Sequence, residues 1–252
     1  MFGKGAEIYR ATAKKNDLYF NRFVMRPIAA QLVAVLAGTG ITPNQVTILA
    51  LFIFIAGGAL LVTLPTWQGA LIGIAVIETS YCFDCVDGML ARHKKVASKE
   101  GHLFDFFTDE LKALILTASL GIRLWRTGGI GVDLQAWPAE APGFLLATVA
   151  AVFTVASALS LTNFVRRPEL SGKATTVEAH YEANVEKKAT SLVGRLAQLV
   201  TTFLRFLNHY PSHIWGFALL GRLDVFFWIY LALNLLYLAR GWLGIILRFG
   251  RG

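Results

Sequence analysis

Two long uncharged stretches constrain this chain more than any other feature of its sequence. No charged residue occurs in residues 42–64 or in residues 143–165. A transmembrane helix needs about 20 consecutive, mainly apolar residues, so each stretch is long enough to cross a bilayer. Hydrophobic residues make up 55% of the chain and charged residues only 16%, whereas roughly 25% charged residues is typical of soluble domains. The sequence therefore predicts an integral membrane protein and excludes a soluble globular or a disordered chain.

The expected fold class is all-α, with about six transmembrane helices. Thr42 and Pro43 are typical of a helix start, because a capping hydroxyl precedes a proline at the first helical position. The expected spans are residues 43–64, 66–83, 101–124 and 143–165, one span within residues 192–221 that is kinked near Pro211, and one from Val225 onward.

An N-terminal segment, residues 1–43, precedes the spans. Its basic residues surround the weakly apolar residues 27–36, a pattern that indicates an amphipathic helix lying on the bilayer surface. We therefore expect two parts in this chain. The first is this juxtamembrane segment, and the second is one membrane domain that comprises residues 44–252.

The basic residues predict orientation rather than nucleic-acid binding. The net charge is +8, but the basic residues lie between apolar runs and not on a polar face with exposed aromatic residues, so we expect no nucleic-acid partner. Short loops rich in Lys and Arg stay on the cytoplasmic side. Outside the N-terminal segment, such residues follow the second and fourth spans: Arg92, Lys94, Lys95, Lys99, Arg166, Arg167, Lys173, Lys187 and Lys188. We expect these loops and both termini to be cytoplasmic.

Four carboxylates gather in residues 84–109, from the end of the second expected span into the start of the third, where the composition otherwise excludes charge. The sequence there reads Asp84-x2-Asp87-Gly88-x2-Ala91-Arg92-x8-Gly101-x3-Asp105-x3-Asp109. Helical periodicity places four of these residues on one face of a helix: Asp84, Asp87, Ala91 and Arg92. It places the last three of the pattern, which are four residues apart, on one face of the next helix. Two facing helices would therefore bring the four carboxylates together.

Carboxylates grouped in this way need cations. Four uncompensated negative charges at a membrane boundary repel one another and are costly to desolvate. Carboxylate oxygens are hard ligands that suit Mg²⁺ or Mn²⁺, and a site with two divalent ions is the simplest interpretation. The small residues of the pattern would let a ligand approach the helix backbones closely.

This pattern resembles the signature of the CDP-alcohol phosphotransferase family, D-x2-D-G-x2-A-R-x8-G-x3-D-x3-D, at all eight fixed positions. The start of the first span, Thr42-Pro43-Asn44-x2-Thr47, is also similar to members of this family. The resemblance implies a six-helix membrane enzyme, generally a homodimer. Such an enzyme cleaves the pyrophosphate of a CDP-linked alcohol, transfers the phosphoalcohol part to an acceptor hydroxyl and releases CMP.

The resemblance also implies roles for individual residues. Metal ions would be held by Asp84, Asp87, Asp105 and Asp109, and Asp109 would also be the base that takes the acceptor's proton. The CDP part would be bound by Asn44, Thr47, Gly88, Ala91, Arg92 and Gly101. The chemistry is consistent with these roles, because metal ions neutralise the pyrophosphate oxygens and a carboxylate beside the acceptor activates its hydroxyl.

Four further polar residues are candidates for the acceptor site. Glu78 lies about two helical turns deeper in the membrane than Asp84. It is either satisfied by a neighbouring helix or accepts hydrogen bonds from substrate hydroxyls, and Asn163 has the same two interpretations. Arg166 and Arg167 either set the orientation and bind anionic lipid, or bind a phosphate-bearing acceptor, because guanidinium groups bind phosphate bidentately.

The expected function is transfer of a phosphatidyl group from a CDP-linked lipid such as CDP-diacylglycerol to a small polar alcohol, in phospholipid biosynthesis. The signature is equally compatible with the reversed roles, in which a CDP-alcohol donates a polar phospho-head group to a lipid hydroxyl such as that of diacylglycerol. Acidic residues within a membrane also mark ion pathways. A cation transporter, or an inactive scaffold with the same fold, is therefore the alternative outside the enzymes.

Overall fold

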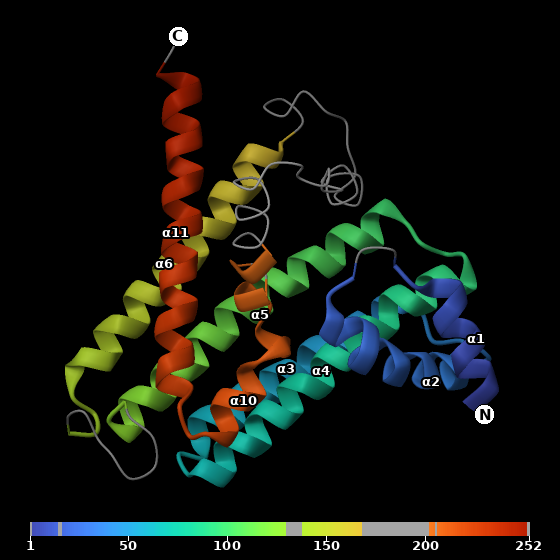
Figure 1. The fold of residues 1–252 in the computed structure, drawn as a ribbon, viewed down its shortest axis with the longest axis horizontal. Coiled ribbons are helices and arrows are strands. Elements are labelled where there is room, and N and C mark those ends of the chain that lie inside the picture. The colour runs from blue at the N-terminus through green and yellow to red at the C-terminus, as the bar shows by residue number, and fades with distance from the viewer. Residues whose placement is uncertain (1, 15–16, 130–137, 168–201, 205, 251–252) are drawn as a thin grey trace, which may run out of the picture. The chain divides into compact units, whose positions relative to one another are not determined.

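The structure is a computed structural model that describes residues 2–14, 17–129, 138–167, 202–204 and 206–250 (Figure 1). Within them the regular elements are helical: α1 (Phe2–Thr12), the π-helical turn η1 (Asn21–Met25), α2 (Arg26–Leu36), α3 (Pro43–Thr63), α4 (Trp67–Lys94), α5 (Lys99–Thr127), α6 (Pro142–Arg166), the 3-10 turn η2 (Tyr210–Ser212), α10 (Ile214–Leu219) and α11 (Leu223–Phe249). The chain forms two compact units. Residues 1–60 and 72–112 make the first, and residues 61–71 and 113–252 make the second.

Four of these helices are long and apolar enough to cross a membrane: α3, α4, α6 and α11. They coincide with the first, second, fourth and last expected spans. The break expected at Pro65 is also present, because α3 ends at Thr63 and α4 begins at Trp67. The polar residues that follow the second apolar run continue α4 without interruption as far as Lys94. The expectation of an all-α integral membrane protein is confirmed.

α5 coincides with the third expected span but differs in composition from the four apolar helices. At about 1.5 Å per residue it is long enough to cross a bilayer. It also carries charged side chains in its first half and near its end, at Lys99, Glu100, Asp105, Asp109, Glu110, Lys112, Arg123 and Arg126. Its composition therefore does not select it as a span, and its crossing of the membrane stays a prediction.

The fifth expected span falls largely outside the described residues. Residues 192–201 and Arg205 are among those that the structure does not describe, as are Lys173, Lys187 and Lys188. In the described remainder, Pro211 lies in η2, and α10 is a helix of six residues, which is too short to cross a bilayer by itself. A total of about six spans therefore also stays a prediction.

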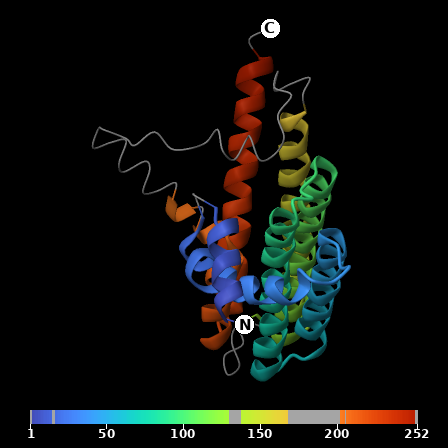
Figure 2. The same cartoon turned by 90° about the vertical axis from the view of Figure 1, so that its right-hand side faces the viewer.

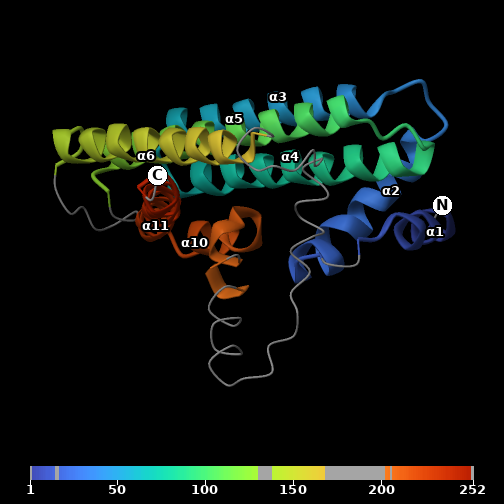
Figure 3. The same ribbon diagram turned by 90° about the horizontal axis from the view of Figure 1, so that it is seen from above.

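In the first unit, α1, η1 and α2 share a core with α3 and α4. Its buried members are Ile8, Met25, Ala29, Ala30, Val33, Val46, Cys82, Cys85, Val86, Met89 and Leu90. Figures 2 and 3 show α3 and α4 side by side. Their contact is close at Gly57, where a Cβ atom would lie 2.7 Å from Cγ1 of Ile77. The segment before the first span is thus folded into helices, and its position on the bilayer surface remains a prediction.

In the second unit, a buried arginine closes the turn between α3 and α4. The C-terminal carbonyls of a helix have no partner within the helix. The guanidinium of Arg123 donates to the carbonyl oxygens of Leu61, Leu64, Pro65 and Thr66, over 2.6–3.1 Å. Arg126 also donates to the carbonyl oxygen of Val62. Elsewhere in this unit α11 packs against α6, and a Cβ atom on Gly241 would lie only 2.5 Å from Leu161.

Candidate active site

Three of the four signature aspartates converge in the first unit. One carboxylate oxygen each of Asp84, Asp105 and Asp109 lies within 4.8 Å of the other two. Asp84 lies on α4, and the other two lie one turn apart on the same face of α5. Oδ1 of Asp105 is buried and has no hydrogen-bond partner among the described residues. Converging carboxylates with an unsatisfied oxygen fit a divalent cation, which takes oxygen ligands of this kind.

The fourth aspartate, Asp87, is instead tied to α3. It is buried, and its Oδ2 lies 2.6 Å from the hydroxyl of the equally buried Thr47. The same hydroxyl lies 3.2 Å from the carbonyl oxygen of Pro43. A hydroxyl has one hydrogen to donate, and the short bond to an ionised carboxylate is the stronger of the two. The start of the first span and the aspartate pattern, which are separate in the sequence, are therefore in direct contact.

A lysine that the sequence analysis missed lies among the carboxylates. The ammonium of Lys112 donates to Oδ1 of Asp84 and, over 3.1 Å, to Oδ1 of Asp109. Its side chain is 4% exposed, whereas that of Asp109 is 52% exposed. The signal in the sequence was a single lysine three residues after Asp109, a spacing that places two side chains on the same helical face.

The small residues of the signature lie beside groups that were expected to bind CDP. A Cβ atom on Gly101 would lie 3.3 Å from Oδ1 of Asn44, so these two candidates adjoin each other. A Cβ atom on Gly88 would lie 3.5 Å from Nη1 of Arg92. Ala91 is partly buried on the same helix. The absence of side-chain bulk therefore leaves room next to an amide and next to a guanidinium.

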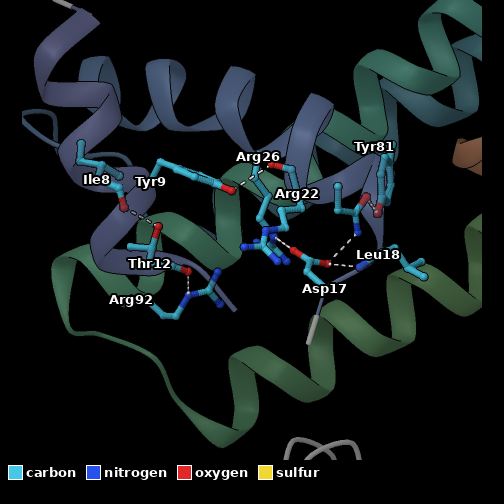
Figure 4. Close-up of polar contacts among 10 residues, drawn as sticks. Ile8, Tyr9, Thr12, Asp17, Leu18, Arg22, Arg26, Tyr81 and Arg92 are labelled. Atoms are coloured by element: carbon cyan, nitrogen blue, oxygen red, sulfur yellow. Dashed lines mark hydrogen bonds and ion pairs between the residues drawn. The ribbon is translucent and has the colours of Figure 1, made fainter. Parts of the chain in front are cut away.

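The N-terminal segment reaches the signature arginine. Nε of Arg92 donates to the carbonyl oxygen of Thr12, 3.2 Å away (Figure 4). Thr12 lies at the end of α1 and is buried, and its own hydroxyl donates to the carbonyl oxygen of Ile8 over 2.7 Å. The sequence predicts this segment on the membrane surface and does not predict its contact with the site.

A buried polar network holds the next part of that segment against α4. Asp17 pairs with the guanidinium of Arg26 and accepts a hydrogen bond from Asn21 over 3.2 Å (Figure 4). Asn21 in turn accepts a hydrogen bond of 2.7 Å from the hydroxyl of Tyr81 on α4. Burial lowers the pKa of Arg26, but the hydrogen bond and charge of Asp17 outweigh this effect, and the pKa is raised. The guanidinium is therefore held in its charged form.

The four candidates for the acceptor site are divided between the two units. Glu78 lies on α4 in the first unit, and both its carboxylate oxygens are buried without a hydrogen-bond partner among the described residues. Asn163 and Arg167 are exposed in the second unit. Arg166 is the last residue of α6, and its side chain lies outside the described part.

Apolar helices of spanning length and a cluster of carboxylates define an integral membrane protein with a candidate metal centre. The model of the CDP-alcohol phosphatidyltransferase family matches residues 40–249, which is most of the chain. The chain therefore belongs to this family. It is a transferase of phosphate-containing groups that acts on a CDP-alcohol in phospholipid synthesis, and the enzymes of its family depend on divalent metal ions. No curated protein matches the sequence.

Proposed function

We propose that this protein transfers a phosphatidyl group from a CDP-linked lipid such as CDP-diacylglycerol to a small polar alcohol. The observation that carries the proposal is the convergence of Asp84, Asp105 and Asp109 at the polar end of an apolar helix, α4. Such a boundary suits one lipid substrate and one water-soluble substrate. We place this boundary, with both termini, on the cytoplasmic side, because the basic residues of the loops favour that orientation.

In this proposal the four aspartates hold two divalent ions, Mg²⁺ or Mn²⁺. When bound, these ions neutralise charge on the pyrophosphate oxygens. Asp84, Asp105 and Asp109 supply converging oxygens, and Thr47 fixes the orientation of Asp87 through its hydrogen bond. The CDP part lies against Asn44, Gly88, Ala91, Arg92 and Gly101, where small residues leave room and the guanidinium of Arg92 can donate to phosphate oxygens.

Asp109 takes the acceptor's proton. Its side chain is half exposed, so a water-soluble alcohol can reach it. As the proton moves to Asp109, the acceptor oxygen bonds to the phosphorus that carries the lipid. The bond from this phosphorus to the bridging oxygen of the pyrophosphate breaks, and CMP leaves with that oxygen.

A phosphate-bearing acceptor would engage Arg166 and Arg167, while Glu78 and Asn163 would accept hydrogen bonds from acceptor hydroxyls. This assignment rests on residue chemistry, because guanidinium groups bind phosphate bidentately. Arg166→Ala is expected to raise the KM for glycerol phosphate or inositol phosphate far more than the KM for the CDP-lipid. Equal effects on the two substrates, or none, would contradict it.

The deciding experiment measures CMP release by the purified protein with CDP-diacylglycerol and Mg²⁺ or Mn²⁺. Serine, glycerol 3-phosphate, inositol and inositol phosphate are compared as acceptors. Release that depends on one acceptor and is lost in EDTA and in Asp109→Asn supports the proposal. A silent panel followed by turnover of CDP-choline or CDP-ethanolamine with diacylglycerol would establish the reversed roles instead. Metal flux without any CMP release would favour a transporter.

The assembly and division of the chain are proposed on family resemblance and sequence pattern. We propose a homodimer, and a membrane domain of residues 44–252 preceded by the juxtamembrane segment of residues 1–43. Light scattering of the protein in detergent measures its oligomeric state and so tests the homodimer. Deletion of residues 1–12 tests whether the juxtamembrane segment is separable, and we expect loss of activity because Thr12 contacts Arg92.

A further inference from the structure

Lys112 is not a residue of the signature, and no role was expected for it. It lies on α5, and its ammonium donates to Asp84 across the interface with α4 and to Asp109 on its own helix. Nearly all of the side chain is buried. Its two partners are members of the carboxylate cluster that is proposed to hold the metal ions.

The charges explain why a cation belongs at this position. Asp84, Asp105 and Asp109 bring three carboxylates close together, and like charges so placed repel one another. One ammonium offsets one of these charges and satisfies two of the oxygens. Removal of one partner from a buried ion pair leaves an uncompensated charge, which is strongly destabilising. The chain thus carries its own counter-ion within the acidic centre.

A divalent ion held by the same carboxylates would lie close to this ammonium. Both cations are attracted by Asp84 and Asp109, and they repel each other over a short distance. Metal binding therefore requires the ammonium either to withdraw from these oxygens or to remain beside the metal at an electrostatic disadvantage. In both cases the lysine weakens metal binding.

We propose that Lys112 is an internal counter-cation that competes with the divalent ion for Asp84 and Asp109. It stabilises the metal-free chain and lowers the affinity of the centre for metal. This role rests on the proposed function only in that the carboxylates are taken as the metal ligands. It gives a chain that folds without metal and exchanges its ions readily.

The test compares Mn²⁺ binding and thermal unfolding of the full-length protein in detergent. Mn²⁺ binding is followed by the electron paramagnetic resonance signal of the free ion, and unfolding is measured in EDTA. Lys112→Met should bind Mn²⁺ about tenfold more tightly than the wild type and unfold at a Tm several degrees lower in EDTA. Lys99→Met removes the same charge from an exposed position at the start of α5. It should leave the Mn²⁺ affinity within about twofold of the wild type.

Unchanged or weaker Mn²⁺ binding by Lys112→Met would overturn the proposal, as would an unchanged Tm in EDTA. Lys112→Arg keeps the positive charge. It tests the proposal if the methionine variant does not fold. The arginine variant should retain the wild-type Mn²⁺ affinity and stability in EDTA, and tighter binding by this variant would also overturn the proposal. CMP release by the wild type tests the proposed function separately, because the metal titration needs no substrate.

Discussion

The hydroxyl of Thr47 and the carboxylate of Asp87, 40 residues apart in the chain, share a buried hydrogen bond of 2.6 Å. Thr47 lies in the first two turns of α3, and Asp87 lies in the polar half of α4. The bond joins the two parts of the sequence that resemble the family. It also leaves one oxygen of Asp87 available for another ligand.

Thr47→Val should reduce both stability and activity. Valine keeps the shape of the side chain but removes the donor, so a buried carboxylate loses its partner at a cost of about 1–3 kcal/mol. We expect a lower Tm and CMP release reduced about tenfold, because a carboxylate without its orienting bond is a poorer metal ligand. Thr47→Ser retains the hydroxyl and should stay close to the wild type in both measurements. A valine variant with wild-type Tm and rate would show that the bond has no such role.

The pair of Asp17 and Arg26 provides a second prediction, for the N-terminal segment. Both side chains are 8% exposed, so Asp17→Asn leaves a buried guanidinium without its counter-charge. Loss of one member of such a pair destabilises by about 3–5 kcal/mol, and the Tm should fall clearly. The double variant Asp17→Asn, Arg26→Met removes both charges and should regain part of the loss. If the double variant is as unstable as the sum of the two single variants, the two side chains do not interact.

The parts of the fold that the sequence predicts well depend on local features. An uncharged run identifies α3 and α6, and Pro65 marks the turn between α3 and α4. Asp105 and Asp109 share a face because residues four apart always do so on a helix. These features require no knowledge of which helices pack together.

The parts that the sequence does not predict depend on packing between helices. Tyr81 and Asn21 are 60 residues apart, and no spacing rule relates them. Lys112 could equally have pointed away from the acidic face of α4, because its partner Asp84 lies on another helix. The prediction for Asp87 was incomplete for the same reason, since its contact with Thr47 follows from the packing of α3 on α4.

Gly101→Ala should weaken binding of the CDP substrate without lowering the stability of the protein. The added Cβ atom would lie 3.2 Å from Oγ of Ser98 and 3.3 Å from Oδ1 of Asn44, so these groups must shift by a few tenths of an ångström. Alanine is a better helix former than glycine by about 1 kcal/mol, so the Tm should hold or rise. The KM for the CDP substrate should increase severalfold if this space admits the nucleotide. Gly3→Ala, where a Cβ atom meets nothing within 4 Å, should leave that KM unchanged.

Substitution of Arg123 should strongly destabilise the second unit. Its guanidinium is buried and donates to four backbone carbonyls at the end of α3 and in the following turn. Arg123→Leu leaves these oxygens without their donor, and each unsatisfied group costs about 1–3 kcal/mol. We therefore expect a loss of stability of at least about 4 kcal/mol, at the upper end for single substitutions.

Arg123→Lys tests whether the arrangement of the guanidinium donors, and not the positive charge alone, closes the turn. Lys has three donors on one nitrogen, whereas the planar guanidinium presents five in a fixed fork, so Arg123→Lys should recover only part of the lost Tm. Arg240→Leu removes the same group from an exposed position on α11 and should change the Tm little. An Arg123→Leu variant that unfolds at the same temperature as Arg240→Leu would mean that the turn is closed without this arginine.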